Sequence, residues 1–352
     1  MHRTISAFLF LTVVSGTIIV ITSEKWFIIW VGLELSTLAL VPILCSKFSP
    51  RKVEATIKYF LIQALSAALL LKRALIQAWL TGSWSILDSV KKVTALCLSL
   101  ALAFKLGLAP CHFWFPDVLQ GLPFLQGLII ATWQKIAPLI LLFYFRQLIF
   151  STLLITAGLI SILIGGWGGL NQTQVRKILA FSSIGKMGWI VVTSIYSVKA
   201  AITMLVIYLI INTAIFLLFD HLKVYTLGHL KTTSQLSPIR VALVILTILS
   251  LGGLPPLTGF ILKFTSLYYL VTNKFILLSS IMIIGSLLRL FFYLRISFNT
   301  RLILFPQHII RVTAWRNKKI VSPLTPKTWL ISILSILSIL AIPLTLPLHI
   351  TI

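Results

Sequence analysis

Long apolar runs separated by short polar stretches dominate the chain. A helix needs about 20 apolar residues to cross a bilayer, and eleven runs of the chain reach roughly that length. The connecting stretches are short except for 220–237 and 298–327. The pattern therefore predicts an all-α polytopic membrane protein with about eleven transmembrane helices, at 5–22, 26–45, 57–80, 93–114, 122–145, 150–170, 176–196, 200–219, 238–268, 275–297 and 328–350.

Two of the predicted helices carry glycine and proline in their interior. The fourth contains Lys105-Leu-Gly-Leu-Ala-Pro110, and the ninth contains Gly252-Gly-Leu-Pro-Pro-Leu-Thr-Gly259, with Lys263 soon after. Proline removes a helical hydrogen bond and clashes with the preceding turn. In lipid, the backbone groups freed by a break must be buried in protein or line a watered cavity. We therefore predict two broken helices, each beside an intramembrane lysine.

Paired broken helices next to charged residues are typical of a transporter core built from inverted repeats. We predict a single transmembrane domain over 1–352 in which helices 1–5, about 5–145, form one repeat. Helices 6–10, about 150–297, form the second repeat, and 328–350 is a separate C-terminal helix. The two breaks then fall on the fourth helix of each repeat.

The composition supports a membrane protein and argues against a nucleic-acid partner. Hydrophobic residues make up 59% and charged residues 10% of the chain, whereas soluble domains carry about 25% charged residues. The net charge of +24 comes from 30 basic and 6 acidic residues. The basic residues lie at the ends of apolar runs, as topology signals and lipid contacts do, rather than in one stripe. We therefore predict lipid contacts, with cardiolipin as a candidate at the basic loops, and no nucleic-acid binding.

The distribution of lysine and arginine between the loops predicts the orientation. If the N-terminus lies inside, seventeen of these residues fall in inside loops, six fall in outside loops and seven lie within spans. Because basic residues accumulate in inside loops, the N-terminus is predicted inside. With eleven helices the C-terminus is predicted outside. Met1-His2-Arg3 runs directly into the first apolar segment, which we expect to be a retained helix without a transit peptide.

The sequence contains no motif for a metal or a redox cofactor. Its cysteines, Cys45, Cys97 and Cys111, are far apart and form no CxxC pair. It has neither a dinucleotide-binding fingerprint nor a P-loop. We therefore predict no cofactor and no metal on this chain.

Five ionisable residues lie inside predicted spans, each on a different one: Glu34, Lys105, Lys135, Lys186 and Lys263. A charge at the bilayer centre costs roughly 2.5–3.5 kcal/mol on insertion scales, and such residues usually mark an ion or proton path. Burial favours a neutral amine, and a nearby carboxylate favours the ammonium ion. A lysine balanced between the two can carry a proton. Their spread over five segments predicts a relay rather than one binding pocket.

Each of these residues also has a structural interpretation. Glu34 is a helix-interface carboxylate if a serine or threonine satisfies it, and the lysines are structural if they extend to the interface. Lys186 lies among serines and glycines that allow close helix packing, so function and packing are equally favoured there. Glu54 and Lys58 have the i,i+4 spacing of an interfacial ion pair.

At these residues the chain resembles a known family. The matching stretches are 30–34, 54–60, 105–110, 112–114, 132–138, 165–179, 182–184, 187–189 and 251–260. These stretches, in the same order along the chain, resemble those of the chain 2 family of mitochondrial NADH–ubiquinone oxidoreductase. Members of that family are antiporter-like membrane-arm subunits of respiratory complex I. Bacterial members resemble fourteen-helix proteins, and the animal form resembles that fold without its first three helices.

The resemblance implies a core subunit of the H⁺-translocating NADH:ubiquinone reductase. It maps the family's polar axis onto Glu34, Lys105, Lys135 and Lys263. NADH, FMN, iron–sulfur clusters and ubiquinone would be bound by other subunits, and other membrane-arm subunits would be the partners. The chain would be multi-pass in the mitochondrial inner membrane, with its N-terminus on the matrix side and its C-terminus on the intermembrane-space side.

Two rival functions remain open. The first is a stand-alone cation/proton antiporter of the same fold, and the second is a purely structural membrane-arm subunit whose lysines organise water and packing. The sequence also departs from the family at Lys186, where relatives carry histidine, and at Lys72 and Arg289. Either the relay has an extra base, or a lysine codon is read as asparagine, as in some animal mitochondria.

Overall fold

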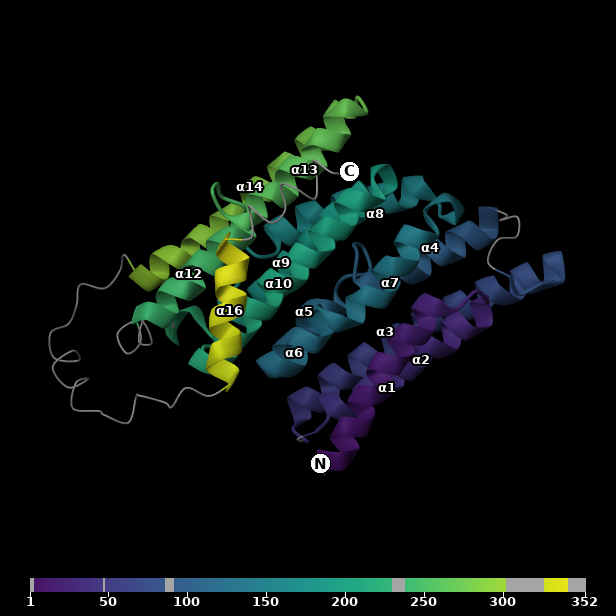
Figure 1. The fold of residues 1–352 in the computed structure, drawn as a ribbon, viewed down its shortest axis with the longest axis horizontal. Helices are drawn as coiled ribbons and strands as arrows, with labels where there is room; N and C mark the ends of the chain where they lie inside the picture. The colour runs from purple at the N-terminus through teal and green to yellow at the C-terminus, as the bar shows by residue number, and fades with distance from the viewer. Residues whose placement is uncertain (1–2, 47, 86–91, 230–237, 302–325, 341–352) are drawn as a thin grey trace, which may run out of the picture. The chain divides into compact units, whose positions relative to one another are not determined.

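The computed structural model describes residues 3–46, 48–85, 92–229, 238–301 and 326–340, and helices make up nearly all of this part (Figure 1). In the described part, β pairing is limited to two isolated bridges, Lys25 with Ser85 and Gln174 with Thr226. The all-α prediction is therefore confirmed. Most of the predicted loop 298–327 and the end of the predicted span 328–350 lie outside the described residues.

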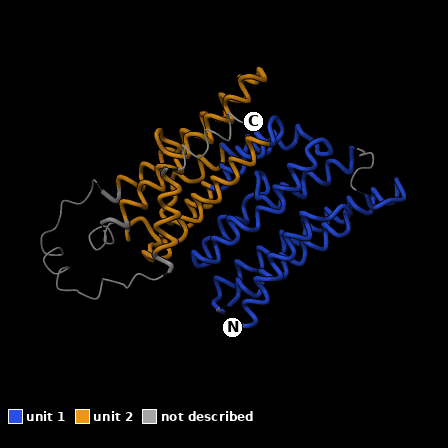
Figure 2. Tube along the Cα trace, viewed as in Figure 1, with its two compact units in different colours: residues 1–162, 183–198 blue, residues 163–182, 199–352 orange. Residues whose placement is uncertain are grey.

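The chain divides into two compact units (Figure 2). Unit 1 comprises Met1–Ile162 and Ser183–Val198, and unit 2 comprises Leu163–Ser182 and Lys199–Ile352. This division places most of the helix after residue 150 with the first unit, so it does not follow the predicted repeat boundary. The inverted-repeat relation stays a prediction.

The helices of unit 1 begin with α1 and α2, which pack against each other, and with α3, which contacts α4 and α5. Their bounds are α1 Arg3–Thr22, α2 Trp26–Leu44, α3 Pro50–Thr81, α4 Lys92–Leu106, α5 Trp114–Gly121, α6 Phe124–Ala131, α7 Trp133–Tyr144 and the 3₁₀ turn η1 Arg146–Leu148. Two further helices, α8 Ser151–Trp167 and α9 Val175–Tyr196, contribute to both units.

In unit 2, α12 contacts α13, α14 and α16. The bounds are α10 Val198–Leu222, α12 Pro238–Gly252, α13 Thr258–Thr272, α14 Ile276–Arg301 and α16 Pro326–Leu340. The described part of the chain holds seven helices that are long and apolar enough to cross a membrane, and three shorter apolar helices. Every one of the eleven predicted ranges contains helix, but the number of membrane crossings stays a prediction.

The two predicted helix breaks are present and have the same local structure. The glycine N–H in each donates to the carbonyl three residues earlier, and the following leucine N–H donates to the carbonyl five residues earlier. This is the hydrogen-bond pattern with which a left-handed residue closes a helix. Gly107 and Gly253 supply that residue, with φ of 70° and 68°. Only glycine adopts this conformation without a steric cost.

The structure adds an interruption to the two predicted ones, in the 122–145 segment. Its helix ends at Ala131, and a new one begins at Trp133. The Thr132 N–H and hydroxyl both donate to the Leu128 carbonyl, at 2.9 and 2.7 Å, but the Lys135 N–H donates to the Thr132 carbonyl, only three residues earlier, at 3.2 Å. Pro138 removes a further backbone donor one turn later. This third break lies directly before Lys135.

Candidate functional site

Three of the four candidate lysines lie beside a helix break. Lys105 is in the last turn of α4, Lys135 is in the first turn of α7 and Lys263 is in α13, shortly after the break at Gly253. A break exposes carbonyl groups that no longer have helical partners, and these groups can accept bonds from an ammonium ion or from water. Lys263 donates to such a carbonyl, that of Gly252, whereas Lys105 and Lys135 donate to side chains of other helices.

Lys105 is 3% exposed, and its Nζ donates to Gln63 Oε1 on α3 at 3.4 Å. Glu34 on α2 is close enough to interact electrostatically with Lys105 and with Tyr59. The structure thus brings two of the predicted relay residues together. The Thr37 hydroxyl donates to Glu34 Oε2 at 2.9 Å, which is the contact that the structural interpretation of Glu34 predicted, while the electrostatic interaction with Lys105 is the one that a relay requires.

Lys135 is 2% exposed and lies against α9 and α5 of the same unit. Its Nζ donates to Ser183 Oγ at 3.4 Å and stands 4.1 Å from the centroid of the Phe115 ring. A hydroxyl and an aromatic face are neutral groups that stabilise an ammonium ion only in part. Such surroundings allow both protonation states of the amine.

Lys263 lies in unit 2, and its Nζ donates to the Gly252 carbonyl at 2.6 Å. That carbonyl belongs to the last residue of α12, where the helix dipole is negative and favours a cation. Arg289 on α14 interacts electrostatically with Lys263. The Arg289 guanidinium is 5% exposed. It disfavours the protonated form of Lys263, because the two groups carry the same charge, whereas the Gly252 carbonyl favours that form.

Lys186 differs from the other three because it lies within the uninterrupted helix α9 and is 8% exposed. Close packing of α8 and α9 occurs nearby. A Cβ added at Gly188 would lie 2.6 Å from the Gly158 carbonyl oxygen. Gly188 therefore serves helix packing near Lys186, as the structural interpretation predicted, and the structure gives this lysine no helix break.

Neutral polar residues form part of this site and were not predicted from the sequence. Gln63 and Ser183 contact Lys105 and Lys135, and Tyr59 lies on the same buried face of α3 as Gln63. Their only sequence signal is a polar residue inside an apolar helix, which is common at helix interfaces. Their relation to the lysines requires the packing of distant helices.

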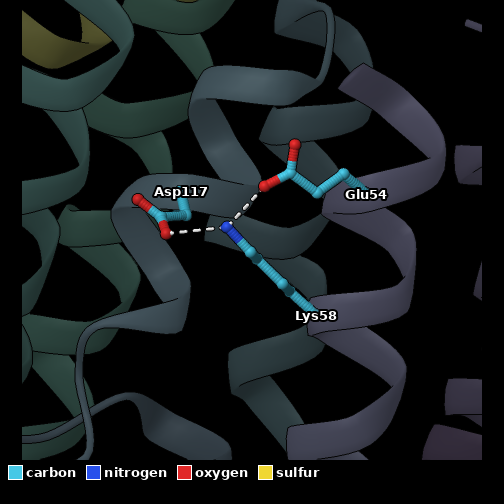
Figure 3. A network of polar contacts seen from close by, with 3 residues as sticks. All are labelled: Glu54, Lys58 and Asp117. Atoms are coloured by element: carbon cyan, nitrogen blue, oxygen red, sulfur yellow. Dashed lines mark hydrogen bonds and ion pairs between the residues drawn. The ribbon is translucent and has the colours of Figure 1, made fainter. Parts of the chain in front are cut away.

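The predicted ion pair between Glu54 and Lys58 is confirmed, with Lys58 Nζ 2.7 Å from Glu54 Oε1. The structure adds Asp117 of α5, whose Oδ2 accepts from the same Nζ at 3.2 Å (Figure 3). His112 is 4% exposed, with Nδ1 3.2 Å from the Pro110 carbonyl oxygen. Among the described residues no group of three or more His, Cys, Asp or Glu side chains is arranged to hold a metal ion.

Comparison with known proteins identifies the family. A family profile described as "NADH:quinone oxidoreductase/Mrp antiporter, TM" matches residues 23–289, and one described as "NADH dehydrogenase subunit 2 C-terminus" matches residues 290–348. The chain belongs to this NADH:quinone oxidoreductase/Mrp antiporter family.

Relatives in this family match the chain over almost its whole length. NADH-ubiquinone oxidoreductase chain 2 of Strongylocentrotus purpuratus is 78% identical over 350 residues, covering 99% of each chain. The protein of the same name from Patiria pectinifera is 51% identical over 319 residues, covering 91% of this chain and 90% of its own. The family resemblance predicted from the motifs is therefore confirmed.

Solved structures of other proteins share the fold. A chain of respiratory complex I from Thermus thermophilus superposes with a TM-score of 0.79 at 24% identity, covering 97% of this chain and 80% of its own. A chain of the Mrp complex from a Dietzia species gives a TM-score of 0.82 at 18% identity, covering 97% of this chain and 75% of its own. At these identities the match shows the antiporter-like fold alone.

Proposed function

We infer that this chain is a core membrane subunit of the proton-pumping NADH:ubiquinone oxidoreductase. We further propose that Glu34, Lys105, Lys135 and Lys263 carry the proton, with Lys186 as a weaker candidate. The observation that carries this proposal is the placement of two buried lysines, Lys105 and Lys135, and the half-buried Lys263 at three helix breaks, each with a neutral hydrogen-bond partner. The chain's relatives are named NADH-ubiquinone oxidoreductase chain 2.

The chemistry of this relay follows from the surroundings of each lysine. A lysine bound to neutral oxygen atoms in an apolar protein can exist as amine or ammonium, and a small change in nearby charge shifts the balance. In the proposed cycle, redox energy released elsewhere in the complex changes the charge near Glu34. The protonation of Lys105 changes in response, then that of Lys135 and Lys263, and one proton leaves on the opposite face.

Electron transfer belongs, in this proposal, to other subunits. The sequence contains no cysteine pair, no dinucleotide fingerprint and no P-loop. NADH, FMN, iron–sulfur clusters and ubiquinone are therefore assigned to other chains of the complex, which are also the partners of this subunit. The chain contributes proton movement to the enzyme and holds no redox centre of its own.

The proposed location is the mitochondrial inner membrane. Seventeen basic residues fall in loops on the same side of the membrane as the N-terminus, and six fall in loops on the opposite side. This distribution supports an N-terminus in the matrix and a C-terminus in the intermembrane space. Basic residues at helix ends also suit an anionic lipid headgroup, for which cardiolipin is the candidate.

The test of the relay is a Lys105→Met substitution in the assembled complex of a genetically tractable homologue. We expect proton pumping and coupled NADH:ubiquinone turnover to fall at least about tenfold, because positioned proton-transfer groups contribute about 10²–10⁴-fold. Lys199→Met, at an exposed position near the start of α10, is the matched control. Unchanged pumping and turnover in Lys105→Met would remove Lys105 from the relay.

The two rival functions make different predictions. A structural subunit predicts that Lys105→Met lowers the amount of assembled complex, while turnover per assembled complex stays normal. A stand-alone antiporter predicts cation/proton exchange by the purified chain in proteoliposomes. Native-gel quantification of the complex and an exchange assay on the isolated chain separate these outcomes from a relay.

A further inference from the structure

A cluster of three charged side chains lies at the start of α3, beside the first helix break. Lys58 Nζ contacts Glu54 Oε1 at 2.7 Å and Asp117 Oδ2 at 3.2 Å (Figure 3). The side chains of Lys58, Glu54 and Asp117 are 42%, 65% and 47% exposed, so all three reach the surface. Two carboxylates that share one ammonium ion can take up a proton and still keep one ion pair.

Buried polar atoms follow this cluster into the protein. Tyr59 Oη, Trp114 Nε1 and Gln63 Nε2 have no hydrogen-bond partner among the described residues. Their side chains belong to residues that are only 0%, 6% and 2% exposed. Buried polar groups in proteins are nearly always hydrogen-bonded, and ordered water commonly supplies the missing partner. The three atoms therefore indicate water between α3 and α5.

The same two helices hold both the charged cluster and these atoms. Tyr59 follows Lys58 directly, Trp114 lies one turn before Asp117, and the centroids of the two aromatic rings are 6.0 Å apart. Gln63 is one turn beyond Tyr59 on the buried face of α3, about 6 Å along the axis. Its Oε1 already accepts a hydrogen bond from Lys105 Nζ at 3.4 Å.

The position of Asp117 relative to its helix break supports a functional role. Asp117 lies ten residues after Gly107, and Lys263 lies ten residues after Gly253 in the second, locally equivalent break. The same distance in sequence from the break thus carries an ionisable residue in both units. The start of α3 is also on the basic-rich side of the chain, which is the side of proton uptake under the proposed orientation.

We propose that Glu54, Lys58 and Asp117 collect protons at the surface and deliver them to Lys105 through water held by Tyr59, Trp114 and Gln63. This inference rests on the proposed function and adds its uptake route. A hydronium ion gives its proton to one of the carboxylates, which passes it to the first water. Each oxygen on the way, including Tyr59 Oη, accepts one proton and releases another, and the Lys105 amine accepts the last.

The first test is Tyr59→Phe in the assembled complex of a tractable homologue, because it removes the hydroxyl and keeps the ring. Tyr208→Phe is the matched control, since Tyr208 is 1% exposed and lies on α10. We expect NADH:ubiquinone turnover per assembled complex, measured in uncoupled membranes, to fall at least about tenfold in Tyr59→Phe alone. The solvent deuterium isotope effect on that turnover should rise, because proton delivery becomes limiting.

The second test is a Glu54→Gln/Asp117→Asn double variant, with Glu24→Gln as a control for losing an exposed carboxylate elsewhere. Both cluster residues are about half exposed, so assembly should be retained. We expect slower uncoupled turnover and partial restoration by millimolar formic acid, which carries protons to the water chain independently of the surface carboxylates. A role in packing would not respond to formic acid.

The outcomes separate this inference from the proposed function. If Tyr59→Phe fails to assemble, the double variant decides alone. The uptake route is overturned if Tyr59→Phe turns over as fast as its control. It is also overturned if the double variant turns over as fast as its control and does not respond to formic acid. If Lys105→Met still abolishes pumping in that case, the proposed function stands and protons reach Lys105 by another way. If Lys105→Met is also unaffected, both proposals fail.

Discussion

At the scale of single residues, the environment of each lysine beside a helix break includes atoms from elsewhere in its unit. Lys263 donates to the Gly252 carbonyl, and a Cβ added at Gly253 would lie 2.7 Å from Lys263 Cε. The glycine therefore does two things: it adopts the left-handed conformation that ends α12, and it leaves room for the lysine stem. The sequence places both residues near a break but does not reveal this contact.

Gly253→Ala should lower turnover more than the same change at Gly82. Both glycines have positive φ, 68° and 70°, so alanine costs about 1–2 kcal/mol of backbone strain at either position. An added Cβ at Gly82 meets nothing within 4 Å, whereas at Gly253 it displaces Lys263. The measurements are NADH:ubiquinone turnover and proton pumping per assembled complex. Equal effects of the two variants would mean that the contact with Lys263 has no functional weight.

At the scale of helices, breaks and loops are held by side chains from distant elements. Arg295 of α14 donates to the carbonyls of Leu170 and Gln172, in the turn between α8 and α9, the second at 2.7 Å. These carbonyls follow the end of α8, where backbone acceptors lack helical partners. The planar guanidinium serves several acceptors at once, which the single ammonium group of lysine does less well.

Arg295→Lys should therefore lower the thermal stability of the complex, by about 1–2 kcal/mol for the lost charge-assisted hydrogen bonds. Arg51→Lys, at an exposed position in the first turn of α3, is the matched control for the same chemical change. The measurement is the midpoint of thermal inactivation of the detergent-solubilised complex. Equal midpoints for the two variants would show that the turn does not depend on Arg295.

Sequence reasoning located the helices well and their interruptions in part. Glycine and proline marked the breaks at Gly107 and Gly253, because few other residues tolerate that backbone geometry. The break at Thr132 was missed, since threonine occurs in many intact helices, where its hydroxyl bonds to the carbonyl four residues earlier as it does here to Leu128. Lys135 was predicted as a relay residue from its place inside an apolar run and from the family resemblance, without this break.

At the scale of the whole molecule, the chain acts as part of an assembly. We expect mass spectrometry of the NADH-oxidising band from a native gel of solubilised mitochondria to contain this chain, with lysine masses at positions 105, 135 and 263. The masses of peptides that contain Lys72 and Lys186 then decide between an extra base in the relay and a lysine codon that is read as asparagine. A lysine mass keeps Lys186 as an extra base, and an asparagine mass removes it and lowers the net charge. A chain found only as a free species would contradict the subunit assignment.

The sequence by itself determined the class of the protein, its helices and two of its breaks, and it supplied the charged residues of the candidate site. These features depend on hydrophobic runs and backbone chemistry, which are local in the chain. Only the tertiary structure brought Gln63 to Lys105, Ser183 to Lys135 and Asp117 to Lys58. Those contacts join residues 42, 48 and 59 positions apart, and helix packing, which no local pattern encodes, decides which of them meet.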